Sequence, residues 1–385
     1  MRRVYFDYSA GSPVDPGVIE AMIPYLEKSF GNPSSLHSDG SRAKNAINEA
    51  KQKVADLIGA NADEIVFTSG GTESNNFALK GVARRRKDRG KHIITTVIEH
   101  ISILNTCKQL QKEGFEISYV PVDKYGTVDI EKLKEEIRSD TILISVMYAN
   151  GEVGTIEPIQ EIGEIAKDKE VYFHVDAVAA AGKIPTAVSE KIDLMSISSN
   201  DMYGPKGTGA LYIKKGTKMQ PIIHGGGQER GLRSGSENVA SIVGMGKSAE
   251  LAKAEMESEA GHISALRDKL VTGILEGITD TYLNGHPKKR LPNNANVRFS
   301  FIEGESIILS LDMEGISTSS SSACTSKTLE PSHVLIAMGI SHADSQGALL
   351  LTLGKNNTKE DVDYLLETLP GIIKRLRDMS PLTPR

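Results

Sequence analysis

A cysteine among small polar residues is the strongest chemical feature of this 385-residue chain. Cys324 lies in the run SSSSACTS at 319–326. Small polar side chains cannot build a core, so we expect an exposed, mobile loop. An accessible thiolate there can act as a nucleophile, a persulfide carrier or a metal ligand. The other cysteine, Cys107, lies in a predicted helix and is expected to be a buried, small apolar residue.

Polar residues also follow several predicted strands. Gly71 and Thr72 come at a strand-to-helix turn, where backbone N–H groups can approach an anion at the helix N-terminus. His100, Asn150 and Asp176 come at or just after the ends of later strands. A carboxylate at such a position can pair with a protonated ring nitrogen. Each signal is modest alone, but we expect all these segments at the same edge of one sheet.

The elements that must position these residues alternate between strands and helices. We expect strands at 64–69, 92–98, 115–122, 141–149, 171–177, 194–198 and 209–213, with amphipathic helices such as 129–138 between most of them. Short apolar strands separated by helices predict a largely parallel sheet covered on both faces. Ligands of such sheets bind at the carboxyl ends of the strands.

The pattern changes after about Gly246. A long charged helical stretch at 247–277 leads to a region where strands mix with helices. This indicates a smaller α+β domain connected by the long helix. We therefore predict a large domain over 15–250 and a small C-terminal domain over 251–385. The small domain would also include residues 1–14, and it would carry the Cys324 loop.

Composition excludes several classes of function. The net charge of −5 and the pI of about 6.0 give no general support for binding nucleic-acid phosphates. No apolar stretch is long enough to span a bilayer, the N-terminus has no apolar signal region, and two distant cysteines form no disulfide framework. We expect a cytoplasmic protein. The basic run at 84–87 suits a solvated helix C-terminus, with a docking patch for an acidic partner as the alternative.

The combined motifs resemble the cysteine desulfurases of the IscS/NifS type. The resemblance is colinear and rests on TSGGTESNN at 68–76, EH at 99–100, HVDA at 174–177, GPKGTGALY at 204–212, GGGQERGLRSGSEN at 225–238, SSACTS and PSHVLIAMG. It implies an α/β fold of the fold-type I pyridoxal phosphate transferases, in a family like the class-V aminotransferases. The large domain would hold a mostly parallel, seven-stranded sheet, followed by a smaller α+β C-terminal domain.

The resemblance also implies which residues would hold the phosphate of pyridoxal phosphate. Gly71 and Thr72 would bind it at the helix N-terminus. Ser198 would contact it, and Asn200, where the family has histidine, can still donate a hydrogen bond to it. Ser236 would reach it from the other subunit of a homodimer.

The remaining implied roles concern the coenzyme ring and the sulfur. His100, as a catalytic residue, would stack on the pyridine ring, Asp176 would pair with the ring nitrogen, and Asn150 would hydrogen-bond the ring hydroxyl. Cys324, the second catalytic residue, would take sulfur from L-cysteine as a persulfide. It would then pass the sulfur to an iron–sulfur scaffold protein of the IscU type.

The chain departs from the family pattern at the coenzyme. The family's Ser-x-His-Lys reads SSND at 198–201, so Asp201 stands where the Schiff-base lysine is expected. A carboxylate cannot form an imine. Ala179 replaces a glutamine that contacts the coenzyme, and Leu350 replaces the arginine expected to clamp the substrate carboxylate. Lys206 matches a second family lysine and is interpreted as structural.

Three hypotheses follow for the function. The first is a desulfurase-like sulfur-transfer protein of iron–sulfur cluster assembly, whose coenzyme is absent or held noncovalently. Its Cys324 would carry a persulfide, from L-cysteine or sulfide, or ligate a [2Fe-2S] cluster shared with the scaffold protein. The second is an active desulfurase that uses noncovalent pyridoxal phosphate, and the third is a noncatalytic partner of an active paralogue. An aminotransferase would give the Cys324 loop no role.

Overall fold

The computed structural model describes residues 2–320 and 331–383. Its main sheet has seven strands in the order β2-β8-β7-β6-β5-β3-β4. They are β2 (Ile65–Thr68), β3 (His92–Thr96), β4 (Glu116–Val120), β5 (Thr141–Met147), β6 (Tyr172–Asp176), β7 (Leu194–Ser198) and β8 (Gly209–Ile213). β8 runs antiparallel to both of its neighbours, β2 and β7, and all other pairs in this sheet are parallel. The predicted, largely parallel α/β sheet is therefore confirmed.

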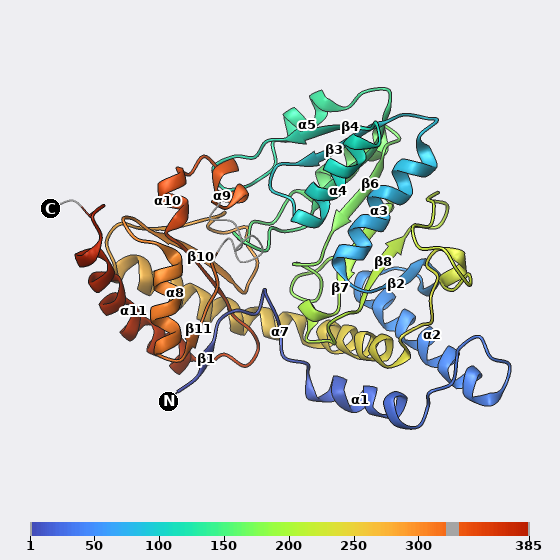
Figure 1. Cartoon of the computed structure of the whole chain (residues 1–385), viewed down its shortest axis with the longest axis horizontal. Coiled ribbons are helices and arrows are strands. Elements are labelled where there is room, and N and C mark those ends of the chain that lie inside the picture. The colour runs from blue at the N-terminus through green and yellow to red at the C-terminus, as the bar shows by residue number, and fades with distance from the viewer. Residues whose placement is uncertain (1, 321–330, 384–385) are drawn as a thin grey trace.

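Helices cover both faces of this sheet, as Figure 1 shows. Val66 packs with residues of α3 (Gly71–Arg86) and α4 (Ile101–Lys112) on one face. Its neighbours Ile65 and Phe67 pack on the other face, in a core shared with α2 (Ser38–Ile58), α6 (Ile159–Asp168) and α7 (Val239–Gly277). Successive side chains of a strand point to opposite faces, so each strand contributes apolar residues to two cores. The remaining helices of this region are α1 (Pro16–Glu27) and α5 (Ile130–Glu136).

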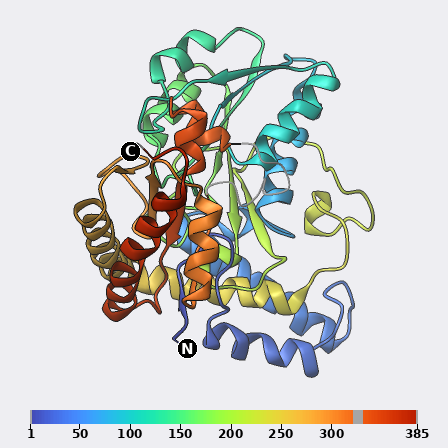
Figure 2. The same cartoon turned by 60° about the vertical axis from the view of Figure 1, so that its left-hand side comes forward.

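A second hydrophobic core forms around a three-stranded antiparallel sheet of the order β12-β10-β9. Its strands are β9 (Thr281–Leu283), β10 (Asn294–Phe299) and β12 (Ala348–Thr352). Helices α8 (Gly304–Met313) and α11 (Lys359–Met379) lie against it, as the turned view in Figure 2 shows. The short helices α9 (His333–Ala337) and α10 (His342–Gln346) follow the undescribed segment 321–330.

The long helix α7 connects the two cores. It packs against α1 and α2 near its start and against α11, β9 and β10 farther along. It begins at Val239, eight residues before the predicted start, because the Asn238 side chain caps it by accepting a hydrogen bond from the Ser241 backbone. The domain boundaries at 15–250 and 251–385 stay a prediction.

The N-terminal segment also crosses to the second core. Strand β1 (Val4–Tyr5) pairs in parallel with β11 (Ile316–Ser317), and Asp7 forms a bridge with Thr352. Together, α7 and the N-terminal segment bring the smaller core beside the carboxyl ends of the large sheet.

Within the described residues, no helix is both long and apolar enough to cross a bilayer.

Candidate active site

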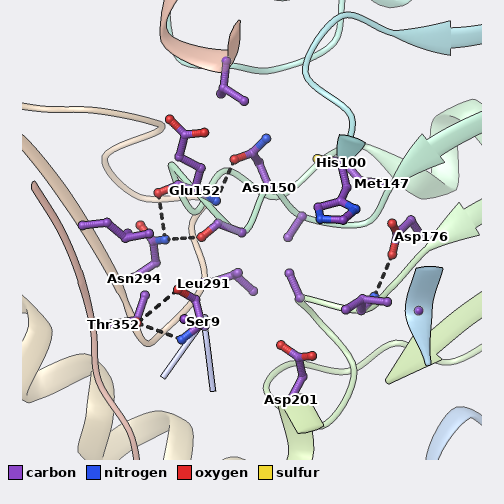
Figure 3. A pocket seen from close by; sticks show the side chains of 18 of the residues that line it. Ser9, His100, Met147, Asn150, Glu152, Asp176, Asp201, Leu291, Asn294 and Thr352 are labelled. Atoms are coloured by element: carbon purple, nitrogen blue, oxygen red, sulfur yellow. Dashed lines mark hydrogen bonds between the residues drawn. The ribbon is translucent and has the colours of Figure 1, made fainter. Parts of the chain in front are cut away.

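A cavity of about 490 Å³ lies where the two cores meet. The large-sheet side contributes residues at the carboxyl ends of β3, β5, β6 and β7, and the smaller core contributes Leu291, Asn294 and Leu350. Figure 3 shows His100, Asp176 and Asp201 around one space, from three separate segments. The cavity brings together these residues predicted from the sequence: Gly71, Thr72, His100, Asn150, Asp176, Ser198 and Asn200.

The start of helix α3 faces this cavity. Gly70, its N-cap, has a φ of +145°, a backbone conformation that L side chains rarely adopt. Gly71 follows as the first helical residue, and a Cβ there would lie 2.5 Å from Cγ2 of Val178. The turn therefore leaves no room for a side chain at Gly71. Its exposed backbone N–H groups suit an anion such as a phosphate.

Asp176 ends strand β6 as a buried carboxylate. Its Oδ2 accepts a hydrogen bond from Nδ2 of Asn75 at 2.6 Å, and its Oδ1 accepts one from the Val178 backbone at 3.0 Å. Burial raises the pKa of Asp176, and nearby His100 offsets only part of that rise. A buried carboxylate is stabilised by a cationic partner such as a protonated ring nitrogen. Oδ1 of Asn75 is also buried and has no hydrogen-bond partner among the described residues.

Two histidines line the cavity. The Nδ1 of His100, the N-cap of α4, accepts a hydrogen bond from the Ser102 backbone at 3.2 Å, so in the neutral ring the proton sits on Nε2. His333 lies in α9, and its Nε2 is 3.0 Å from the carbonyl oxygen of Glu99. Burial lowers the pKa of His333. The sequence pattern predicted a role for His100 but none for His333.

Asn150 holds a tight turn at the cavity edge. Its Oδ1 accepts hydrogen bonds from the backbones of Glu152 and Val153, both at 2.9 Å, and its Nδ2 donates to the Ile98 carbonyl at 3.0 Å. One amide hydrogen is left for a ring hydroxyl. Oγ of Ser332 donates to Oε1 of Glu152 at 2.5 Å. This contact attaches the residue before α9 to the same turn.

Residue 201 offers no amine to the cavity. Asp201 lies in the short 3₁₀ turn Asn200–Met202 after β7, and its Oδ1 is 3.4 Å from Nζ of Lys183. Ala179 and Leu350 also line the cavity, so neither a glutamine nor an arginine is available at those positions. Nζ of Lys206 donates to the Ser12 carbonyl at 2.8 Å and does not line the cavity. The interpretation of Lys206 as a structural or solvated lysine stays a prediction, with which this contact is consistent.

Among the described site residues predicted from the sequence, Ser236 does not line this cavity. Ser236 lines a separate hollow of about 210 Å³, together with Ser69 and Thr208. Cys324 lies outside the described residues. Cys107 is fully buried as expected, and burial raises the pKa of its thiol to about 12. Among the described residues, no group of three or more histidine, cysteine or carboxylate side chains could hold a metal ion.

The cavity fits the noncovalent contacts that pyridoxal phosphate would need. The N-terminus of α3 suits the phosphate, and the buried Asp176 carboxylate suits the pyridinium. Oδ1 of Asn75, without a hydrogen-bond partner among the described residues, is a further polar atom in the cavity wall. The covalent contact at residue 201 does not fit, because Asp201 has no nitrogen to bond an aldehyde.

Comparison with known proteins gives consistent matches. Residues 4–365 match the family described as aminotransferase class-V. The chain is 59% identical over 383 residues to cysteine desulfurase IscS 1 of Archaeoglobus fulgidus, covering 99% of this chain and 100% of that protein. A solved NifS-like protein superposes with a TM-score of 0.92 at 42% identity, covering 97% of this chain and 100% of that one. A structure described as SspA in complex with cysteine matches with a TM-score of 0.82 at 37% identity, covering 92% and 100%.

Proposed function

This chain belongs to the class-V aminotransferase family, and within it to the cysteine desulfurases, and on this basis we propose that it transfers sulfur during iron–sulfur cluster assembly. The transfer takes place in the cytoplasm, where thiols remain reduced. Cys324 carries the sulfur as a persulfide. The protein acts as a homodimer and delivers the sulfur to a scaffold protein of the IscU type.

The chemistry at Cys324 is a transfer of one sulfur atom. A sulfane sulfur donor, such as a polysulfide, is attacked by the Cys324 thiolate, and the donor leaves one sulfur atom shorter. With L-cysteine as donor, the carbon–sulfur bond breaks, the sulfur becomes the outer atom of the persulfide, and the remainder leaves as L-alanine. Neither of these routes needs an external oxidant, whereas sulfide would need a two-electron oxidant and is not proposed as the donor. As an alternative end state, the Cys324 thiolate ligates a [2Fe-2S] cluster shared with the scaffold.

The cavity residues hold the coenzyme without a bond at residue 201. When bound, pyridoxal phosphate supplies the electron sink that weakens bonds at the substrate's α-carbon. Asp176 would pair with its ring nitrogen, His100 would stack on the ring, and Asn150 would hydrogen-bond the ring hydroxyl. Gly71, Thr72, Ser198 and Asn200 would bind the phosphate, and Ser236 of the second subunit would complete that site.

One observation carries this proposal. The polar contacts that suit the coenzyme surround one cavity. Asp201 and Leu350 line the same cavity, at the positions where the family has a lysine to bond the aldehyde and an arginine to clamp the substrate carboxylate. Lysine also serves as the usual proton shuttle, and general acid–base help contributes about 10²–10⁴ in rate. Turnover of free L-cysteine should therefore be slow, while acceptance of sulfur by Cys324 does not require the cavity.

The surviving contacts also favour a second candidate. Because Asn75 and Val178 still orient Asp176, pyridoxal phosphate and L-cysteine that have already condensed in solution could bind together. The protein would then be an active desulfurase that tolerates Asp201.

The experiment separates donor from coenzyme. Purified protein is incubated with polysulfide, without coenzyme, and the persulfide on Cys324 and the sulfur passed to an IscU-type scaffold are measured by mass spectrometry. We expect loading and transfer. In parallel, sulfide release from L-cysteine with added coenzyme is compared with that of Asp201→Lys. Equal rates would favour the second candidate, and no loading of Cys324 from either donor would refute both.

A further inference from the structure

A lysine that no motif singled out lies in the cavity beside Asp201. Lys183 follows β6 on the loop that begins at Asp176, and Gly182 before it has a φ of +80°. A Cβ on Gly182 would lie 2.6 Å from Cγ of Met202, so the close approach of these two segments fixes where Lys183 starts. Among the described residues that line the cavity, Lys183 is the only lysine or arginine.

The Lys183 amine is held at residue 201. Its Nζ lies 3.4 Å from Oδ1 of Asp201 and donates to the Ala179 carbonyl at 3.2 Å. The side chains of Lys183 and Asp201 are only 15% and 12% exposed. The cavity therefore contains a primary amine next to the position where the family's lysine is expected, although it comes from the loop after β6.

We propose that Lys183 is the carbonyl-reactive amine of this cavity, and that Asp201 is the proton acceptor that serves it. The inference rests on the proposed function in one point, that the cavity admits pyridoxal phosphate. It adds a reversible bond at a residue other than 201. The ligand class is a small aldehyde that carries a phosphate, matched to the Lys183 amine and the N-terminus of α3.

The proposed step needs no co-reactant. The Lys183 ammonium passes a proton to Oδ1 of Asp201, and the freed Nζ lone pair attacks the carbonyl carbon. The carbonyl oxygen takes up the two protons that remain on Nζ and leaves as water, so a C=N bond remains and Asp201 keeps the third proton. Activation of a nucleophile by an adjacent general base is a recurrent arrangement in covalent catalysis. Nothing is oxidised or reduced.

Lysines outside the cavity provide the contrast. Nζ of Lys206 is bound to the Ser12 carbonyl, and Nζ of Lys355 is paired with Asp15. Neither lines the cavity. Lys206→Arg is therefore a control, because it changes an exposed lysine close in sequence to Asp201 without touching the cavity.

The test traps the bond chemically. Full-length protein is mixed with equimolar pyridoxal phosphate and reduced with sodium borohydride, and the modified lysines are mapped by peptide mass spectrometry. We expect at least tenfold more modification at Lys183 than at Lys206. Lys183→Arg should lose this label while Lys206→Arg keeps it. Equal total labelling of Lys183→Arg and the unchanged protein, or labelling at surface lysines alone, would overturn the proposal.

A second ligand separates this inference from the proposed function. Pyridoxamine phosphate has no aldehyde, so its binding, followed by fluorescence, reports the cavity without the amine reaction. Binding of pyridoxamine phosphate without label at Lys183 would refute the role of Lys183 and leave the cavity's role intact. Absence of both would refute the coenzyme site itself, and sulfur transfer by Cys324 is measured independently of either.

Discussion

Nδ2 of Asn75 donates a hydrogen bond to Oδ2 of Asp176 at 2.6 Å and another to Oγ of Ser102 at 2.9 Å. Asn75 lies in the first turns of α3, the helix whose N-terminus faces the cavity. Helix α3 thus offers its N-terminal N–H groups to an anion and also positions the Asp176 carboxylate through Asn75. A ligand with a phosphate at one end and a basic ring nitrogen at the other could contact both groups.

Asn75→Ala should weaken coenzyme binding. The change removes a charge-assisted hydrogen bond, worth about 1.5–3 kcal/mol, from the buried Asp176. We expect about 10- to 100-fold weaker binding of pyridoxamine phosphate, measured by fluorescence titration. Asn76→Ala is the matched control, since the bond that Nδ2 of Asn76 makes among the described residues goes to the Thr72 carbonyl of its own helix. Equal losses in the two variants would contradict the assigned role.

Gly71→Ala should close the phosphate position. Its new methyl group would meet Cγ2 of Val178 at 2.5 Å, so one of the two segments must shift. We expect at least tenfold weaker binding of pyridoxamine phosphate and a loss of about 1–3 kcal/mol in unfolding free energy. The double variant Gly71→Ala/Val178→Ala removes the clash. Its failure to recover stability would show that the Val178 contact is not the cause.

Asp201→Lys should create a coenzyme bond at residue 201, because Asp176 and the α3 N-terminus are already arranged for the ring and phosphate. Borohydride reduction with pyridoxal phosphate should label the peptide that contains residue 201. Asp201→Arg brings the same positive charge without a reactive amine and should give no label there. Sulfide release from L-cysteine should need Leu350→Arg in addition, since the described residues that line the cavity include no arginine for the substrate carboxylate. An unlabelled residue 201 at saturating coenzyme would mean that the ring site is not competent.

Cys324→Ala should abolish sulfur transfer to the scaffold, with a loss of at least 100-fold, because it removes the only thiolate in the 319–326 run. Cys107→Ala is the control. The Cys107 thiol is buried and its pKa is raised to about 12, so it remains a protonated, inert thiol at neutral pH. Scaffold sulfur is counted by mass spectrometry. Retained transfer in Cys324→Ala would exclude a role for that loop.

His174 should govern part of the acid stability. Burial lowers its pKa to about 3, and Ser145 and Ser196 contact its two ring nitrogens, both at 2.9 Å. The unfolded chain binds a proton at a pKa near 6.5, so stability is complete above that pH and falls as the pH drops toward 3. His174→Gln should cost about 1–3 kcal/mol at pH 7 but flatten the loss between pH 6.5 and 4.5, measured by urea unfolding. An unchanged pH slope would refute this assignment.

Much of the fold could be predicted from local patterns. All seven predicted strands of the large sheet are present, because short apolar runs between helices have few alternatives to a buried parallel sheet. Their ends were placed too late at residues 97–98 and 148–149, where the chain leaves the sheet edge while still apolar. The start of helix α7 was also placed too late, because the Asn238 cap fixes it at Val239.

The sequence by itself determined the residue types at the sheet edge and the loss of an amine at position 201, because both are properties of single positions. Only the tertiary structure brought Lys183 beside Asp201, linked Ser332 to Glu152, and placed His333 at the Glu99 carbonyl. The two residues of each pair lie on separate segments, and no local sequence pattern shows that these segments come close together. Their contacts depend on how the two cores and their connecting loops pack, and packing is a property of the whole chain.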